Sequence, residues 1–278
     1  MKKQTPHPLK AYEDIEFLKS PNARVIRMIA EFVEPQHRFR RAGVRDTIVF
    51  FGSARILPRK EALKQLGKVE GSIPKKGRVT KKQLHELRAG QTAAEMSRYY
   101  EDCVTLSRLL TQWSKSLSSS NRFVVCSGGG PGIMEAANKG AALAKGKSIG
   151  MNISLPYEQT SNAFIMRDLN FEFHYFFMRK FWFVYLAKAL VIFPGGFGTL
   201  DELMEVLTLL QTGKIKKKMA VVIYGTDYWK KVIDFDQMVF QGVISRSDLK
   251  LFTFKDDPYE AFEYLKQTLM RNYPTPRA

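Results

Sequence analysis

The chain has 278 residues, of which 45% are hydrophobic, and it carries a formal net charge of +17 at pH 7. This length and composition predict a globular protein with a substantial core, built as one large α/β domain or two small ones. Two cysteines, Cys103 and Cys126, exclude a disulfide scaffold and a cysteine-based metal site. As buried free thiols, they favour a reducing compartment.

Residues 1–10 lead into no apolar region, which excludes an ordinary signal peptide. The longest apolar stretch, Phe181–Phe193, is interrupted by Lys188 and is too short to span a bilayer. We therefore expect a cytoplasmic protein without a membrane segment. Its positive charge favours anionic partners such as nucleotides, nucleic acid or an acidic surface, but does not choose among them.

Residues 1–45 predict a helical arm ahead of the main domain. A short helix is expected around Tyr12–Leu18. A second helix should end at Glu34, because Pro35 cannot continue it. Residues 36–45 would then be a basic linker.

Residues 46–272 predict a single domain, whose first buried strand is Thr47–Phe51. Gly52 and Ser53 follow this strand directly. In an open parallel sheet, ligands bind at the carboxyl ends of the strands, so these two residues are candidates for a binding site. The glycine would permit close approach, and the serine hydroxyl would donate a hydrogen bond. An ordinary turn is an equal alternative.

Residues 56–90 form a basic insertion, with ten Lys and Arg residues against three Glu. Gly71, Pro74 and Gly77 interrupt it, so a mobile loop or a helical hairpin is expected. No aromatic residues are interleaved with the charges for base stacking. A solvated face is therefore favoured over a nucleic-acid patch.

Two strand–glycine–helix junctions are the strongest functional signals. In the first, the strand Phe123–Cys126 runs into the turn Ser127–Gly132 and an alanine-rich helix. In the second, the strand Ala189–Phe193 runs into a glycine turn and a helix that begins near Thr199. Such a junction points backbone N–H groups and the positive end of the helix dipole at one place. A phosphate can bind there without a cationic side chain.

The two junctions also exclude some ligands. Neither is followed by the Gly-Lys-Ser/Thr of a Walker A loop. The first lacks the third glycine of the dinucleotide fingerprint, since Ile133 stands there. A mononucleotide or another phosphate ester therefore fits better than NAD or ATP with magnesium. Asp201 and Glu202 lie in the first helical turn after the second junction, where they either complement the helix dipole or act on the ligand.

The aromatic segment Phe173–Phe183 predicts a packed helix. Within it, the adjacent cations Arg179 and Lys180 need partners such as a phosphate, a substrate or the Glu202 carboxylate. His174 is expected to be a structural histidine and not a proton shuttle. Lysines 214 and 216–218 precede a strand at the end opposite the proposed site, so they are expected to be solvated.

Strands and helices alternate along the whole chain, which predicts a Rossmann-like α/β fold, a doubly wound parallel sheet with helices on both faces. The remaining expected elements are the helix Thr92–Ser118, the strands Ser148–Ile153, Asn170–Phe173, Met219–Tyr224 and Leu251–Phe254, the loop Tyr157–Asn162, the helix Tyr228–Phe240, and a final helix from Asp257 to Met270 before a tail over 273–278.

Four motifs give the chain a resemblance to one family. The stretch from Pro194 to Glu202 matches Pro-Gly-Gly-x-Gly-Thr-x-x-Glu, and Met178–Lys180 supplies a Met-Arg-Lys element. The other two motifs are Gly52–Arg55 and Ser127–Gly140. With these motifs, the chain resembles the long bacterial branch of the Lonely Guy-type (LOG) cytokinin riboside 5′-monophosphate phosphoribohydrolases. Many members of that family have been labelled lysine decarboxylases. The resemblance does not extend to the N-terminal arm, residues 1–45, or to the basic insertion, residues 56–90.

The resemblance implies a homodimer with its site near the subunit interface, a nucleoside 5′-monophosphate substrate, and no cofactor or metal. AMP or N6-modified AMP would be hydrolysed at the N-glycosidic bond to free base and ribose 5-phosphate. Glu202 would stabilise the oxocarbenium-like ribose, and Arg179 would position the substrate and polarise the departing group. The expected substrate-binding residues are Gly52, Ser53, Gly128, Gly129, Gly130, Glu135, Asn138, Met178, Lys180, Gly195, Gly196, Gly198 and Thr199.

Two other functions compete with this one. Lysine decarboxylation would require a Schiff-base lysine for pyridoxal phosphate, and no residue in the sequence marks one. A nucleotide- or nucleic-acid-binding protein without turnover is the alternative. The high net charge favours it, whereas a carboxylate and an arginine beside a bound anion favour the enzyme.

Overall fold

The structure, a computed structural model, describes residues 7–74, 79–117, 122–155 and 160–274. Some expected features lie wholly or partly outside these residues. They are the start of the arm, the tip of the basic insertion with Lys75, Lys76 and Arg78, the segment Ser118–Asn121, the loop Tyr157–Asn162 and the end of the C-terminal tail.

Seven parallel strands form one sheet in the order β4-β3-β2-β1-β5-β6-β7. The strand order reverses between β1 and β5, which places the topological switch point at the centre of the sheet. The Rossmann-like, doubly wound fold is therefore confirmed. The strands are β1 (Thr47–Phe51), β2 (Val124–Ser127), β3 (Ser148–Ile153), β4 (Asn170–Phe173), β5 (Ala187–Ile192), β6 (Ala220–Tyr224) and β7 (Thr253–Lys255).

Helices cover both faces of the sheet, and each face has its own core. Along β1, Val49 and Phe51 face the first core, while Ile48 and Phe50 face the second, as the two-residue period of a strand requires. The first core includes α2 (Arg24–Arg41), α7 (Phe176–Leu186), α8 (Phe197–Gln211), α9 (Thr226–Val232) and α10 (Phe235–Phe240). The second includes α5 (Arg98–Ser116), α6 (Ile133–Leu143) and α11 (Pro258–Asn272).

Helix α2 continues through Pro35, so the expected helix end before this proline is wrong. Proline lacks the N–H that would bond the carbonyl four residues earlier, which belongs to Glu31. The indole Nε1 of Trp182, on α7, donates to this Glu31 carbonyl at 3.0 Å instead. Because a tertiary contact satisfies the freed acceptor, most of the expected basic linker over 36–45 is helical, up to Arg41.

Two other expected helices are each divided in two. The helix expected over 92–118 is interrupted at Ser97, which separates α4 (Lys81–Met96) from α5. The helix expected over 228–240 is interrupted at Ile233, and Asp234 then caps α10 by accepting from a backbone N–H. In both places a short polar side chain, Ser97 or Asp234, forms a hydrogen bond with the nearby backbone. This bond competes with continuation of the helix.

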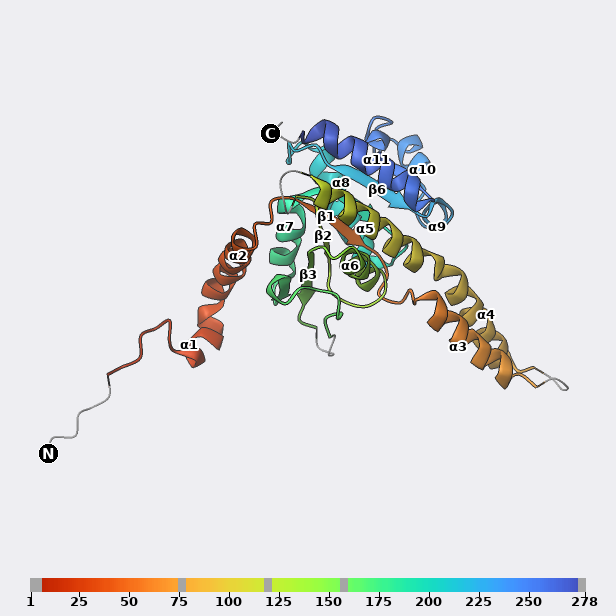
Figure 1. Cartoon of the computed structure of the whole chain (residues 1–278), viewed down its shortest axis with the longest axis horizontal. Helices are drawn as coiled ribbons and strands as arrows, with labels where there is room; N and C mark the ends of the chain where they lie inside the picture. Colours follow the sequence, from red (N-terminus) through yellow and green to blue (C-terminus); the bar gives the residue numbers. More distant parts are fainter. Residues whose placement is uncertain (1–6, 75–78, 118–121, 156–159, 275–278) are drawn as a thin grey trace.

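The basic insertion is a helical hairpin, one of its two expected forms. Helix α3 (Arg59–Ser72) packs along α4, and the pair projects away from the sheet (Figure 1). The N-terminal arm, with α1 (Ile15–Lys19) and α2, extends on the other side of the view (Figure 1). No helix in the described part of the chain is long and apolar enough to cross a membrane.

Residues far away in the sequence hold both ends of α7. At its N-terminus, the Glu31 carboxylate accepts from the backbone N–H groups of His174 at 2.8 Å and Tyr175 at 3.2 Å. At its C-terminus, Lys217 Nζ donates to the carbonyls of Val184 and Tyr185. The expectation that Lys217 is solvated is therefore wrong, because the unpaired carbonyls of a helix end attract a cation. Burial lowers the pKa of Lys217 to about 8.

Candidate active site

Backbone hydrogen bonds join three loops at the carboxyl ends of β1, β2 and β5. The Ser53 N–H donates to the Pro194 carbonyl at 2.9 Å, and the Ile133 N–H donates to the Ser53 carbonyl at 3.1 Å. Glycines permit this approach, because a Cβ on Gly132 would lie 2.4 Å from Ser53 O, and one on Gly195 would lie 3.1 Å from Ser53 N. The fold thus brings both glycine junctions and the end of β1 to the switch point.

The N-terminus of α8 is free of side-chain caps. Gly196 is the N-cap residue, and among the described residues no side-chain hydrogen bond caps the helix. A Cβ on Gly196 or Gly198 would meet nothing within 4 Å, so the backbone borders open space at both positions. The first N–H groups of α8 are therefore available to an anion.

Glu202 and Arg179 form a buried pair between α8 and α7. Glu202 is 5% exposed, and its Oε1 lies 3.9 Å from Arg179 Nη2. This separation is within ion-pair range but beyond hydrogen-bond distance. Arg179 Nε is also buried, with no hydrogen-bond partner among the described residues. The guanidinium lies over the rings of Phe176 and Phe183, 5.1 and 5.5 Å from their centroids.

The environment of this pair shifts both pKa values towards neutrality. Burial raises the pKa of Glu202 to about 7, although the charges of Arg179 and Lys180 act in the opposite direction. Burial lowers the pKa of Arg179, against the effect of Glu202. The Glu202 carboxyl is therefore balanced between its acid and carboxylate forms near neutral pH, where a group can accept and return protons.

The other residues of the Met-Arg-Lys element make protein contacts. Lys180 Nζ lies 2.8 Å from an Asp201 oxygen and 3.0 Å from a Glu205 oxygen. Met178 is half-buried and packs against the first core. The prediction that the two adjacent cations need partners is confirmed, and these partners all come from α8.

A buried amide network holds the first glycine junction. Asn138 is fully buried and accepts hydrogen bonds from Ser127 Oγ at 2.7 Å and from Asn162 Nδ2 at 2.9 Å. Asn162 also donates to the carbonyls of Gly129 and Gly130. Asn138 therefore lies inside the loop framework, which keeps the turn in place. Nothing in the sequence pattern marks Asn162 as its partner.

The remaining expected residues of this region lie between the loops and α6. Glu135 accepts a hydrogen bond from the Tyr100 hydroxyl at 2.5 Å. A Cβ on Gly128 would lie 2.7 Å from the Met134 sulfur, so this glycine allows the loop to pack closely on α6. Gly52 serves the same packing, since its Cβ would lie 2.7 Å from an Ile133 methyl carbon.

Sequence reasoning did not single out Tyr100 or Tyr228 as site residues, because they belong to none of the four motifs. The Tyr228 hydroxyl donates to the Gly195 carbonyl at 3.0 Å and so steadies the glycine turn before α8. His174 is exposed. Within the described ranges, no group of three or more His, Cys, Asp or Glu side chains is placed to hold a metal ion.

Comparisons with known proteins match parts of this chain. Residues 134–265 match the model of a family described as "possible lysine decarboxylase". A pyrimidine/purine nucleotide 5′-monophosphate nucleosidase of Escherichia coli K12 is 30% identical over 129 residues, 40% of this chain and 27% of that protein. A cytokinin riboside 5′-monophosphate phosphoribohydrolase of Arabidopsis thaliana is 40% identical over 60 residues, 21% of this chain and 27% of that protein. The chain thus spans about a quarter of the length of these two relatives.

Among solved structures, the Moco carrier protein from Chlamydomonas reinhardtii is 18% identical to the chain, with a TM-score of 0.43. The match covers 82% of this chain and 99% of that one. The fold and the site define a Rossmann-like α/β protein with two glycine-rich strand–helix junctions at its switch point. Parts of this chain are thus similar to the family described as possible lysine decarboxylase and to proteins named cytokinin riboside 5′-monophosphate phosphoribohydrolase.

Proposed function

We propose that the protein hydrolyses the N-glycosidic bond of a nucleoside 5′-monophosphate, AMP or N6-modified AMP, to free base and ribose 5-phosphate. The buried pair of Glu202 and Arg179 beside the uncapped N-terminus of α8 is the observation that carries this proposal. A site that only bound an anion would gain nothing from a buried carboxylate next to it. The names of the relatives support the same reaction class.

In the proposed reaction, the N–H groups at the start of α8 hold the 5′-phosphate, and the ribose lies towards Glu202. The bond between C1′ and the base nitrogen breaks, its electron pair leaves with the base, and positive charge develops on the ribose. The Glu202 carboxylate stabilises that charge. Water then adds to C1′ and loses a proton to Glu202 or solvent, while the departing base gains one. Arg179, whose Nε has no protein partner among the described residues, donates to the substrate.

Base release from a panel of nucleoside 5′-monophosphates, followed by chromatography, tests the proposal. The wild type should release adenine or an N6-modified base, and Glu202→Gln should lose about 100-fold or more of the turnover while it still binds nucleotide. Asp201→Asn is the matched control, because it removes an exposed carboxylate from the same helical turn. Full turnover by Glu202→Gln, or an equal loss in Asp201→Asn, contradicts the assignment of Glu202.

The basic hairpin favours a second candidate function, binding to nucleic acid without turnover. Helices α3 and α4 project from the body, and the charges on the insertion are mostly positive (Figure 1). Binding to random DNA at several salt concentrations measures this directly. A steep fall of affinity with salt supports a phosphate-backbone contact, and no measurable binding removes the candidate.

We further propose a cytoplasmic homodimer with the site near the subunit interface. Three phenylalanines near the catalytic pair support it: Phe176 is 52% exposed, Phe177 53% and Phe197 94%. Large exposed apolar side chains beside a site are a feature of protein interfaces. The two buried free cysteines fit a reducing compartment. Light scattering should give twice the chain mass of 31.9 kDa, and a monomer mass would contradict the dimer.

A further inference from the structure

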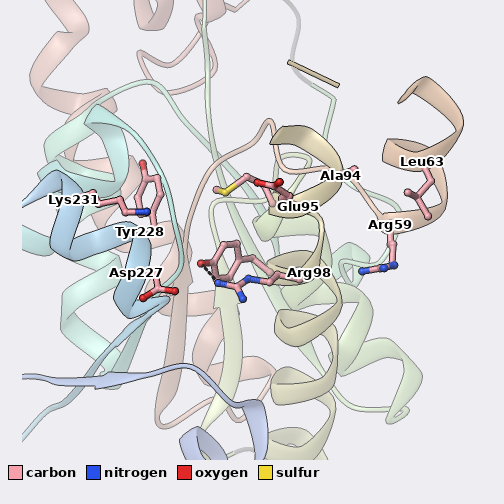
Figure 2. Close-up of a pocket in the computed structure, with 10 residues that line it drawn as sticks. Arg59, Leu63, Ala94, Glu95, Arg98, Asp227, Tyr228 and Lys231 are labelled. Carbon is pink, nitrogen blue, oxygen red and sulfur yellow. Dashed lines mark hydrogen bonds between the residues drawn. The ribbon is translucent and has the colours of Figure 1, made fainter. Parts of the chain in front are cut away.

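A pocket of about 660 Å³ lies between the base of the α3–α4 hairpin, the start of α5, and α9. Figure 2 shows its two walls: Asp227, Tyr228 and Lys231 on one side, and Arg59, Glu95 and Arg98 on the other. Its volume is within the range of small-molecule sites, about 300–1,000 Å³. Neither Glu202 nor Arg179 lines it, so it is distinct from the catalytic pair.

Three cations from three different helices line this pocket. They are Arg59 on α3, Arg98 on α5 and Lys231 on α9. Among the described residues, none of them lies within the 4.0 Å that defines an ion pair with a carboxylate. Arg98 donates to the Tyr99 hydroxyl at 2.8 Å and lies 4.7 Å from the centroid of that ring. The pocket therefore has cationic groups that are not neutralised by direct protein contacts.

Two tyrosines line the pocket: Tyr99 is buried in its wall, and the half-buried Tyr228 offers an aromatic surface. Tyr99 is buried against Gly225, where a Cβ would lie 2.8 Å from the ring and where φ is +96°. Tyr228 is fixed by its hydrogen bond to the Gly195 carbonyl at 3.0 Å. This hydrogen bond links the α9 wall of the pocket directly to the glycine turn before α8. Both rings are anchored by glycines that follow the strands β5 and β6.

We propose that this pocket is a second ligand site and that it takes a nucleotide. Arg59, Arg98 and Lys231 suit phosphate groups, and a tyrosine ring suits a base. The Glu95 and Asp227 carboxylates can accept hydrogen bonds from ribose hydroxyls or a base amino group. One wall belongs to the basic insertion, which the matched family segment over 134–265 does not include. The site is therefore a feature of this chain's insertion and does not depend on the proposed hydrolysis.

Isothermal titration with ATP as the probe, in the presence of saturating ribose 5-phosphate, tests the second site. Ribose 5-phosphate is the product of the proposed reaction and should keep the catalytic site occupied. We expect one ATP per chain, with about tenfold weaker binding in Lys231→Ala and in Arg59→Ala, since each removes a charged contact. Lys230→Ala is the matched control, because Lys230 is the exposed neighbour of Lys231 on α9 and does not line the pocket.

The second site is overturned if ATP does not bind, if ribose 5-phosphate displaces it, or if Lys231→Ala binds ATP as well as Lys230→Ala does. The titration measures binding and not base release. Failure of the proposed hydrolysis, with ATP binding that depends on Lys231, would therefore leave this site standing. Base release without ATP binding would remove the second site alone.

Discussion

Glu202 is buried beside an arginine that lies within ion-pair range but does not hydrogen-bond to it. Burial removes the carboxylate from water and so costs it hydration free energy. At 3.9 Å, the attraction of Arg179 offsets only part of this cost, and the pKa of Glu202 is therefore raised. A closer, bidentate arginine would hold the carboxyl ionised at all physiological pH values. The longer separation keeps both protonation states within reach and leaves arginine donors for a substrate.

The raised pKa makes a prediction about stability. The folded state keeps its proton on Glu202 up to about pH 7, whereas the unfolded chain loses it near pH 4.5. The folded protein thus binds more protons between these values, and the free energy of unfolding should fall as pH rises through this window. Between pH 4.5 and pH 7, the free energy of unfolding of Glu202→Gln should rise relative to that of the wild type by at most about 3 kcal/mol. Urea unfolding at several pH values measures this, and a constant difference would contradict it.

The same group should govern the pH dependence of activity. If ionised Glu202 stabilises the ribose cation, kcat/KM for AMP should fall about tenfold per pH unit below about pH 7. A profile of base release from pH 5 to 9 checks this. The residual activity of Glu202→Gln should lack this acid limb. A wild-type limb that persists in the variant would assign the ionisation to another group.

At the scale of elements, α7 carries Arg179 but is held in place by parts of the chain far from it. Glu31 caps its N-terminus, Lys217 caps its C-terminus, and Trp182 bonds the carbonyl that Pro35 leaves free. Its orientation towards α8 is further held by Lys180 and its two carboxylate partners. The N-terminal arm, which lies outside the family resemblance, thereby supports the helix that carries a proposed catalytic residue.

A double-mutant cycle tests the relation between Trp182 and Pro35. Trp182→Phe removes the indole N–H and leaves the Glu31 carbonyl without its donor. In a Pro35→Ala background, the backbone N–H of residue 35 can take over this acceptor. Trp182→Phe should therefore cost about 1–2 kcal/mol more in the wild type than in Pro35→Ala. Urea unfolding of the four proteins gives the difference, and strictly additive costs would show that the helix does not need this bond.

At the scale of the whole molecule, the sequence predicts the sheet better than the helix boundaries. The strand Thr47–Phe51, in which all five residues are buried, lies where its apolar run places it. Buried parallel strands are continuous apolar runs, so local composition is enough to find them. The passage of α2 through Pro35 depends on Trp182, which lies far away in the sequence, and no local pattern contains that contact.

In the candidate site too, features carried by local motifs were predicted, whereas features that depend on tertiary contacts were not. The glycine junctions and the Arg179–Glu202 pair follow from motifs whose spacing is local. Asn162 and Tyr228 were missed because their roles arise only when separate loops meet. Asn138 was expected to contact the nucleotide, yet its side chain is turned into the loop framework. An amide in a helix after a glycine turn looks the same in sequence whichever way it faces.

Deleting residues 1–41 should destabilise the rest of the protein. Phe39 is buried against Phe171 and Trp182, with ring centroids 4.8 and 5.4 Å apart, and Arg38 donates to the Asn170 carbonyl at 2.8 Å. Loss of a buried phenylalanine alone typically costs about 3–5 kcal/mol. The truncated chain should melt earlier and bind a hydrophobic dye, whereas removal of residues 1–13 should change neither. An unchanged melting temperature after the longer deletion would mean that α2 is not part of the folding unit.

The position of α2 also matters while the protein is being made. Glu31 and the backbone of His174 are 143 residues apart in the chain, and Trp182 emerges later still. At typical elongation rates of about 5–20 residues per second, the ribosome needs about 7–30 s to synthesise that interval. Throughout it, Phe32 and Phe39 of α2 lack the rings of α7 that they contact in the folded protein. In a nascent chain, the contacts that hold the N-terminus of α7 and satisfy the Glu31 carbonyl therefore form many seconds after α2 has been made.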